Sequence, residues 1–84
     1  MIRQPVESSL IASVGYDPTS KQLDVGFKPK PGEVSPVYRY QNVTPEDHAN
    51  LLGAESIGRH FGEFIRKQPE KFPGRKLTEE EATQ

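Results

Sequence analysis

The chain has 84 residues, 32% of them hydrophobic, so it has the length and composition of one small domain with a modest core. Eleven basic and twelve acidic residues give a formal net charge of −1, which excludes a polycation that coats nucleic acid along its whole length. The absence of cysteine excludes disulfide bonds, thiolate zinc sites and cysteine nucleophiles. No apolar run approaches the roughly 20 residues that span a bilayer, and no signal sequence is recognisable, so we expect a cytoplasmic protein that does not contact a membrane.

Two segments near the start of the chain predict the strands of a β-hairpin. Residues 9–16 and 22–28 both alternate apolar and polar side chains with a period of two. Between them, Asp17 can accept a hydrogen bond from the backbone and Pro18 presets a turn. We therefore expect these two strands to pair with each other.

A proline-rich segment separates this hairpin from a third predicted strand. Residues 29–36 contain three prolines, which remove backbone donors, so we expect a long exposed loop that serves as a stiffened connector. The alternative is an extension that docks in a groove of a partner protein. The third strand is predicted over residues 37–43, with Tyr38 and Tyr40 on one of its faces.

The pattern changes to a helical one after the third strand. Thr44 is typical of a helix N-cap and Pro45 of the first helical position, so a first helix is predicted to begin here. Ser56 is placed to cap a second helix, in which apolar residues recur at the spacing of one helix face. The predicted core combines this face with one face of the second strand: Leu23, Val25, Phe27, Ile57, Phe61, Phe64 and Ile65.

These elements predict an α+β fold in the order β-β-β-α-α, in which a three-stranded antiparallel sheet is followed by two helices packed on one face. The predicted domain covers residues 8–68. The ends, residues 1–7 and 77–84, lack a patterned apolar face and are expected to be flexible. Phe72 and Leu77 are apolar exceptions near the C-terminus, and we expect one of them to fold back onto the domain.

Seven short segments form an ordered pattern along most of the chain: Ser8-Ser9, Gly15-Tyr16-Asp17-Pro18, Leu23-Asp24-Val25-Gly26-Phe27, Val37-Tyr38-Arg39-Tyr40, Leu51-Leu52-Gly53-Ala54-Glu55-Ser56-Ile57-Gly58, Phe61 and Ile65-Arg66. In this pattern the chain resembles the KTSC domain, a small module named for its position C-terminal to some lysyl-tRNA synthetases. The family also occurs as free-standing small bacterial or phage proteins. Through its association with the synthetases, the resemblance implies a role in RNA binding.

The chain departs from the family pattern at two places. The family usually has a tight Ser-Gly turn between the second and third strands, where this chain has the proline-rich loop of residues 29–36. It also usually has an Asn after the phenylalanine of the second helix, where this chain has Gly62. If that Asn carries an activity in the family, this chain lacks the residue for it.

No residue pattern predicts catalysis, a metal site or a cofactor. His48 and His60 lie twelve residues apart without a third ligand at metal-binding spacing, and we expect His60 to be partly exposed at the surface. The serines do not occur in the Gly-x-Ser-x-Gly pattern of a hydrolase nucleophile. We therefore expect a noncatalytic binding module.

RNA is the first partner that the basic residues suggest. The predicted site combines Arg39 on the third strand, Lys28 and Lys30 at the start of the loop, and Arg59 in the second helix. We expect Arg39 to point away from the two tyrosines and to be exposed, and the lysines to reach successive phosphates. The alternative is a small protein–protein interaction module, or a phage or bacterial regulator that acts on a host protein. The pattern leaves the oligomeric state open.

Four further residues have two interpretations each. Tyr38 and Tyr40 either stack on unpaired bases or, as we expect, pack into the core beside the phenylalanines. Ser56 and Gly58 could offer backbone N–H groups to an anion at the start of the second helix. The interpretation that we favour is packing, in which Gly58 and Gly62 let this helix approach the sheet or the first helix closely.

Overall fold

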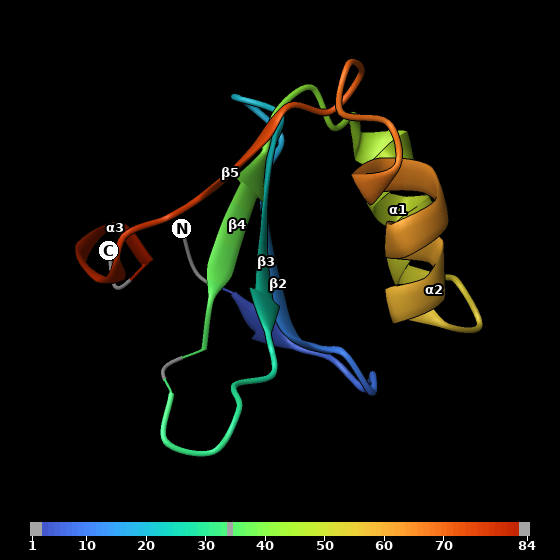
Figure 1. Cartoon of the computed structure of the whole chain (residues 1–84). Coiled ribbons are helices and arrows are strands. Elements are labelled where there is room, and N and C mark those ends of the chain that lie inside the picture. The colour runs from blue at the N-terminus through green and yellow to red at the C-terminus, as the bar shows by residue number, and fades with distance from the viewer. Residues whose placement is uncertain (1–2, 34, 83–84) are drawn as a thin grey trace.

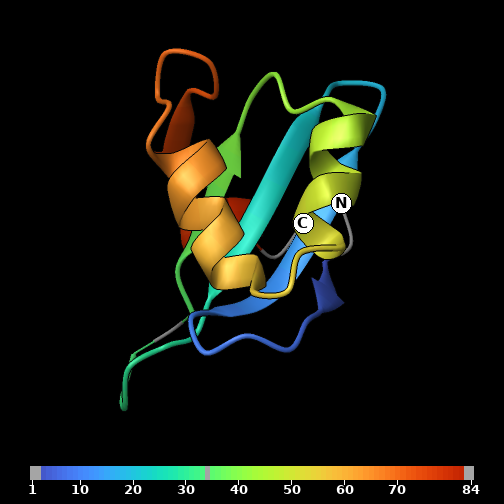
Figure 2. The same ribbon diagram turned by 90° about the vertical axis from the view of Figure 1, so that its right-hand side faces the viewer.

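The computed structural model describes residues 3–33 and 35–82, and within these ranges the chain forms an antiparallel sheet and a layer of helices (Figure 1). In chain order the elements are β1 (Gln4–Pro5), β2 (Ile11–Asp17), β3 (Gln22–Phe27), β4 (Val37–Tyr40), α1 (Pro45–Leu52), α2 (Ile57–Phe61), the π-helix η1 (Gly62–Arg66), β5 (Gly74–Lys76) and α3 (Glu79–Ala82). The strands lie in the order β1-β2-β3-β4-β5, and each neighbouring pair is antiparallel. The helices α1 and α2 cover one face of the sheet (Figure 2), whereas α3 lies on the opposite side (Figure 1).

The α+β class and the two helices on one face of an antiparallel sheet confirm the predicted architecture, but the predicted number of strands is wrong. Within the described residues the sheet has five strands instead of three, because β1 and β5 extend it at both edges. β1 has two residues and β5 has three, all of them exposed. Strands this short show no alternation of apolar and polar side chains, so periodicity cannot reveal them.

Side-chain caps confirm the predicted starts of both helices. Thr44 Oγ1 accepts a hydrogen bond from the Asp47 N–H at 3.1 Å, and the Asp47 carboxylate accepts one from the Thr44 N–H at 3.2 Å. At the start of α2, Ser56 Oγ accepts from the Arg59 N–H at 3.4 Å. α1 has eight residues, and nowhere in the described ranges is a helix long and apolar enough to cross a membrane.

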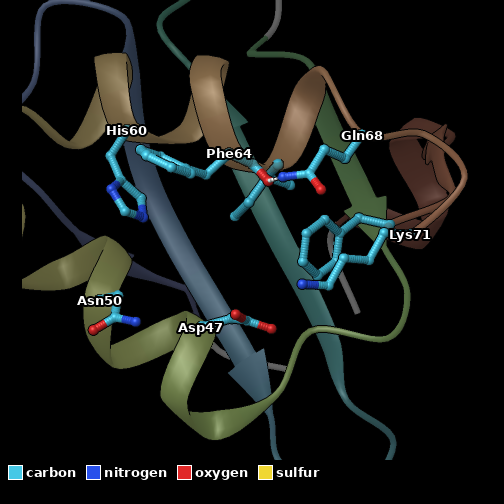
Figure 3. Close-up of a pocket in the computed structure, with 8 residues that line it drawn as sticks. Asp47, Asn50, His60, Phe64, Gln68 and Lys71 are labelled. Atoms are coloured by element: carbon cyan, nitrogen blue, oxygen red, sulfur yellow. Dashed lines mark hydrogen bonds between the residues drawn. The ribbon is translucent and has the colours of Figure 1, made fainter.

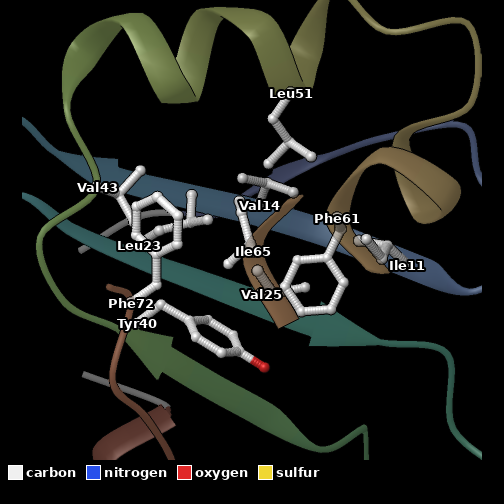
Figure 4. Close-up of a cluster of buried hydrophobic side chains, with 10 residues drawn as sticks. All are labelled: Ile11, Val14, Leu23, Val25, Tyr40, Val43, Leu51, Phe61, Ile65 and Phe72. Carbon is white, nitrogen blue, oxygen red and sulfur yellow. The ribbon is translucent and has the colours of Figure 1, made fainter. Parts of the chain in front are cut away.

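The core lies between the sheet and the helices, around the ring of Phe61 (Figure 4). Phe61 is 0% exposed, and its ring meets those of Phe27 at 5.5 Å and Tyr40 at 5.3 Å, both edge-to-face. The buried cluster consists of Ile11, Val14, Leu23, Val25, Tyr40, Val43, Leu51, Phe61, Ile65 and Phe72. The predicted core is confirmed for the buried residues Leu23, Val25, Phe61 and Ile65, and for Phe27 and Ile57, which pack against the cluster.

Phe64 is the exception among the predicted core residues, because its side chain is 51% exposed. α-Helical spacing places it on the same stripe as Phe61 and Ile65, but residues 62–66 form the π-helix η1. A π turn closes hydrogen bonds between residues i and i+5, so each residue rotates the chain by a smaller angle than in an α-helix. The smaller rotation keeps Ile65 on the core side and moves Phe64 away from it.

The packed structure continues past residue 68, the predicted end of the domain. Phe72 joins the core cluster and Leu77 is also buried, so both apolar exceptions fold back onto the domain, where one was expected. The flexibility predicted for residues 1–7 and 77–84 stays a prediction. The first two and the last two residues of the chain lie outside the described part.

The proline-rich segment forms the predicted exposed loop between β3 and β4. Residues 28–33 are exposed, and residue 34 lies outside the described part of the chain. At the base of the loop, the Phe27 N–H donates to the Pro36 carbonyl at 2.9 Å, and the Ser35 hydroxyl donates to the Phe27 carbonyl. These hydrogen bonds bring the two ends of the loop together beside the sheet.

A row of charged side chains crosses the sheet on the face opposite α1 and α2. Asp24 on β3, Arg39 on β4 and Arg75 on β5 are successive partners in the strand register. Arg39 donates to both carboxylate oxygens of Asp24, at 2.7 and 2.9 Å. Arg75 pairs with Glu81 at 2.7 Å, and the guanidinium together with the Thr78 N–H lowers the pKa of Glu81 to about 2. The Asp24 side chain is only 3% exposed, so its charge depends on Arg39 for compensation.

Replacing Phe61 with Ala should lower the free energy of unfolding by about 3–5 kcal/mol, because it leaves a cavity at the centre of the core. The matched control is Phe64→Ala, which removes the same atoms from a half-exposed position and should cost about 1 kcal/mol. Urea unfolding followed by circular dichroism measures both losses. Equal losses of stability for the two variants would show that Phe64 belongs to the core, and would contradict the π turn that moves it away.

Replacing Asp24 with Asn should lower the free energy of unfolding by about 3 kcal/mol, because Arg39 would keep its buried charge without a partner. The double variant Asp24→Asn/Arg39→Met should recover part of this loss, since it removes the uncompensated charge as well. Glu33→Gln, in the exposed loop, is the control and should change stability by about 0.5 kcal/mol at most. A loss for Asp24→Asn no larger than that of the control would contradict a structural role for the pair.

Candidate functional site

A groove with a volume of about 210 Å³ lies where side chains of β3, β4 and η1 meet. It is lined by Leu10, Phe27, Tyr38, Tyr40 and Arg66. Four of these side chains are aliphatic or aromatic, and the fifth is a guanidinium. The groove therefore combines aromatic surface with a positive charge, and it contains no carboxylate or imidazole for acid–base chemistry.

The two tyrosines reach the groove from the core face of β4. Tyr40 is buried against Phe61, whereas Tyr38 is half-buried and meets Phe27 edge-to-face at 5.6 Å. The prediction that both tyrosines face the core is therefore confirmed. Tyr38 packs at the rim of the core rather than at its centre, so part of its ring stays accessible from the groove.

Two cations that the sequence analysis did not select lie at or beside this groove. Burial raises the pKa of Tyr40, and the positive charge of Arg66 opposes that rise, so Arg66 lies close enough to act on the hydroxyl. Lys76 on β5 is the register partner of Tyr38, so the two side chains leave the sheet on the same face. Both cations are exposed, and among the described residues neither has an ion-pair partner. The direction of the Arg66 side chain depends on the π turn, and the direction of the Lys76 side chain depends on a strand of only three residues. No pattern in the sequence could therefore predict that these two cations lie at the groove.

The first lysine of the loop lies beside the same groove. The Lys28 N–H donates to the Leu10 carbonyl at 2.9 Å, and Leu10 is one of the groove residues. Lys30 follows two residues later in the exposed part of the loop. Lys28 is thus fixed near the groove through its backbone, while both lysine side chains remain exposed.

Arg39 lies on the opposite face of the sheet from the groove. Its side chain points away from the tyrosines, as predicted, but the prediction that it is exposed is wrong, because only 21% of the side chain is accessible. Asp24 is its direct partner in the strand register, and a buried carboxylate requires a countercharge. The guanidinium is therefore held on the sheet by two hydrogen bonds to Asp24.

The glycines and the arginine of the second helix have separate environments. Arg59 is largely exposed and pairs with Glu63 at 3.1 Å. A Cβ atom added to Gly58 would lie 3.0 Å from Ser8 Oγ and 3.5 Å from the Leu10 side chain, so the close approach that Gly58 allows is to the segment before β2. At Gly62 an added Cβ would meet no described atom within 4 Å, so the close approach predicted there is wrong.

Only part of the predicted set of binding residues converges in space. The residues that lie at or beside the groove are Tyr38, Tyr40 and Lys28. The others lie apart: Lys30 in the exposed loop, Arg39 on the opposite sheet face, and Ser56, Gly58 and Arg59 at the start of α2.

The chain is similar in sequence to two bacterial proteins. An uncharacterized protein of Stutzerimonas stutzeri is 38% identical over 72 residues, which cover 86% of this chain and 94% of that protein. A protein of Tsukamurella paurometabola is 40% identical over 63 residues, which cover 75% of this chain and 87% of the relative.

The fold is similar to that of a solved structure as well. The crystal structure of a KTSC domain protein from Yersinia pestis superposes with a TM-score of 0.76 at 39% identity, over 92% of this chain and 97% of that one. The sequence model of the KTSC domain matches residues 7–68. The chain therefore belongs to the KTSC domain family.

Proposed function

We propose that this chain is a noncatalytic module that binds single-stranded RNA along the groove between β4 and η1. The observation that carries the proposal is the combination, in one groove, of partly accessible aromatic rings with an unpaired guanidinium. Phe27 and Tyr38 offer π surface on which unpaired bases stack, and Arg66 can stack on a base or hold a phosphate. Stacking of this kind tolerates any base, so the expected preference is for single strands and not for a particular sequence.

The lysines around the groove support a path for the RNA backbone. Lys76 stands beside Tyr38, and Lys28 is held next to Leu10. Lys30 follows two residues after Lys28 in the same exposed loop and adds a second positive charge there. Cations beside aromatic rings suit a single strand, because its backbone can follow the positive charges while its bases stack on the rings.

A protein partner is the second candidate, and one observation favours it. Leu10 is 44% exposed at the edge of the groove, which is a large accessible area for an aliphatic side chain. A peptide that covers Leu10 and Phe27 would bind mainly by apolar burial, which depends weakly on salt. RNA binding would weaken steeply as salt rises, because counterions are released from the phosphates.

Fluorescence anisotropy with a labelled single-stranded RNA of about eight nucleotides, at about 50 and about 200 mM salt, tests the RNA proposal. Arg66→Ala should weaken binding and lower the slope of log K against log salt by about 0.7, the value for one lost phosphate contact on a single strand. Tyr38→Leu should weaken binding with an unchanged slope, because it removes stacking and no charge.

Lys21→Ala is the matched control, since it removes one exposed positive charge from the turn between β2 and β3. It should leave the affinity and the slope close to those of the unmodified protein. If Lys21→Ala and Arg66→Ala changed the RNA affinity and the salt slope equally, the RNA site would not be the groove. A protein that binds no RNA at the lower salt concentration would contradict the proposed function.

A further inference from the structure

A second concave site lies between α1 and η1 and contains the half-exposed ring of Phe64 (Figure 3). This cleft has a volume of about 180 Å³. Its lining includes His60, Phe64 and Gln68 from the segment of α2 and η1, Asp47 and Asn50 from α1, and Lys71 from the turn after η1. An accessible aromatic ring is thus present beside η1 in addition to the rings of the groove.

The Phe64 ring is held in place by its neighbours. His60 is half-buried, and so partly exposed as predicted, and its ring meets the Phe64 ring at a centroid distance of 4.6 Å. Gln68 Nε2 donates to the Phe64 carbonyl at 2.7 Å (Figure 3). With 51% of its side chain accessible, Phe64 therefore offers a positioned π surface to the solvent.

The cleft and the groove lie on the two sides of η1. Phe64, Ile65 and Arg66 are consecutive residues of this π-helix, and they point to the cleft, the core and the groove respectively. The two sites share no lining residue, so only the width of the helix separates them. A helix with its side chains is about 10–12 Å wide, which a single strand spans with about three nucleotides even when its bases stay stacked.

Positive charges accompany the way from the groove to the cleft. Arg66 lines the groove, and Lys67 follows it at the C-cap of η1. The Lys71 side chain reaches into the cleft, where its ammonium lies 5.1 Å from the centroid of the Phe72 ring (Figure 3). All three cations are exposed, and none has an ion pair within the described ranges.

The acidic residues beside this path have partners of their own. Glu63 on η1 pairs with Arg59 at 3.1 Å. The Asp47 carboxylate accepts two hydrogen bonds from Thr44 at the start of α1, so it is held on the far wall of the cleft. The surface of η1 that joins the two sites therefore suits a polyanion.

We propose that a single-stranded RNA in the groove continues across the outer surface of η1 and stacks a further base on Phe64 in the cleft. Lys67 meets a phosphate where the strand crosses the helix, and Lys71 meets the next phosphate at the cleft. This inference rests on the proposed RNA binding and adds its footprint, which is longer than the groove. Stacking on Phe64 accepts any base, so the added contact raises affinity without selecting a sequence.

Fluorescence anisotropy with the full chain and a labelled RNA of about eight nucleotides tests the crossing, with an unlabelled RNA of about three nucleotides as a competitor that is too short to reach both sites. Phe64→Leu should raise the dissociation constant of the longer RNA about tenfold, the effect of one lost stacking contact, and that of the shorter RNA less than about twofold. Lys67→Ala should lower the salt slope of the longer RNA by about 0.7. Tyr38→Leu should weaken the binding of both.

Two variants serve as matched controls. Phe64→Tyr keeps an aromatic ring in the cleft and should retain the affinity for the longer RNA. Leu52→Ala should also leave it unchanged, because Leu52 is a similarly exposed apolar residue of α1 that lines neither the cleft nor the groove.

An unchanged affinity of Phe64→Leu for the longer RNA would overturn this inference. If Tyr38→Leu still weakened binding, the groove would remain the RNA site and only the crossing would be wrong. Equal losses of affinity for both RNA lengths in Phe64→Leu would also overturn it, since the RNA would then enter the cleft without crossing from the groove. An unmodified protein that binds neither RNA would contradict the proposed function itself.

Discussion

The packing of Phe61 is the constraint on which the rest of the structure depends. Its ring is fully buried and meets Phe27 and Tyr40 edge-to-face, so it connects the second helix to β3 and β4 at once. A chain of this size has one small core, and no other aromatic ring in the described residues meets two others from different strands. The position of the groove, which Phe27 and Tyr40 line, is therefore fixed by the same contacts.

The π-helix that follows Phe61 distributes its side chains over three environments. Ile65 stays in the core, Phe64 is half-exposed in the cleft between α1 and η1, and Arg66 lies in the groove. A regular α-helix would instead bury Phe64 beside Phe61. In our account the proposed RNA groove thus depends on five residues whose backbone departs from α-helical geometry. This departure is local, and the two helix starts before it are those that the caps specify.

The features that could be predicted from the sequence are those set by near neighbours in the chain. Alternation predicted β2 and β3, and Thr44 and Ser56 predicted the helix starts, because each signal spans only a few residues. The direction in which the Phe64 side chain points could not be predicted, because it depends on a π turn and no simple sequence pattern indicates one. The pairing of Arg39 with Asp24, and the position of Lys76 beside Tyr38, depend on strand register, which periodicity leaves undetermined.

The central claim is that the accessible aromatic rings of the groove contact bases. The most direct measurement is an isotope-filtered nuclear Overhauser experiment on the ¹³C-labelled protein with an unlabelled single-stranded RNA. Our account predicts contacts between base protons and the ring protons of Phe27 and Tyr38, and none to the Asp24–Arg39 face of the sheet. Contacts confined to that opposite face, or an absence of any contact to the two rings in a saturated complex, would contradict it.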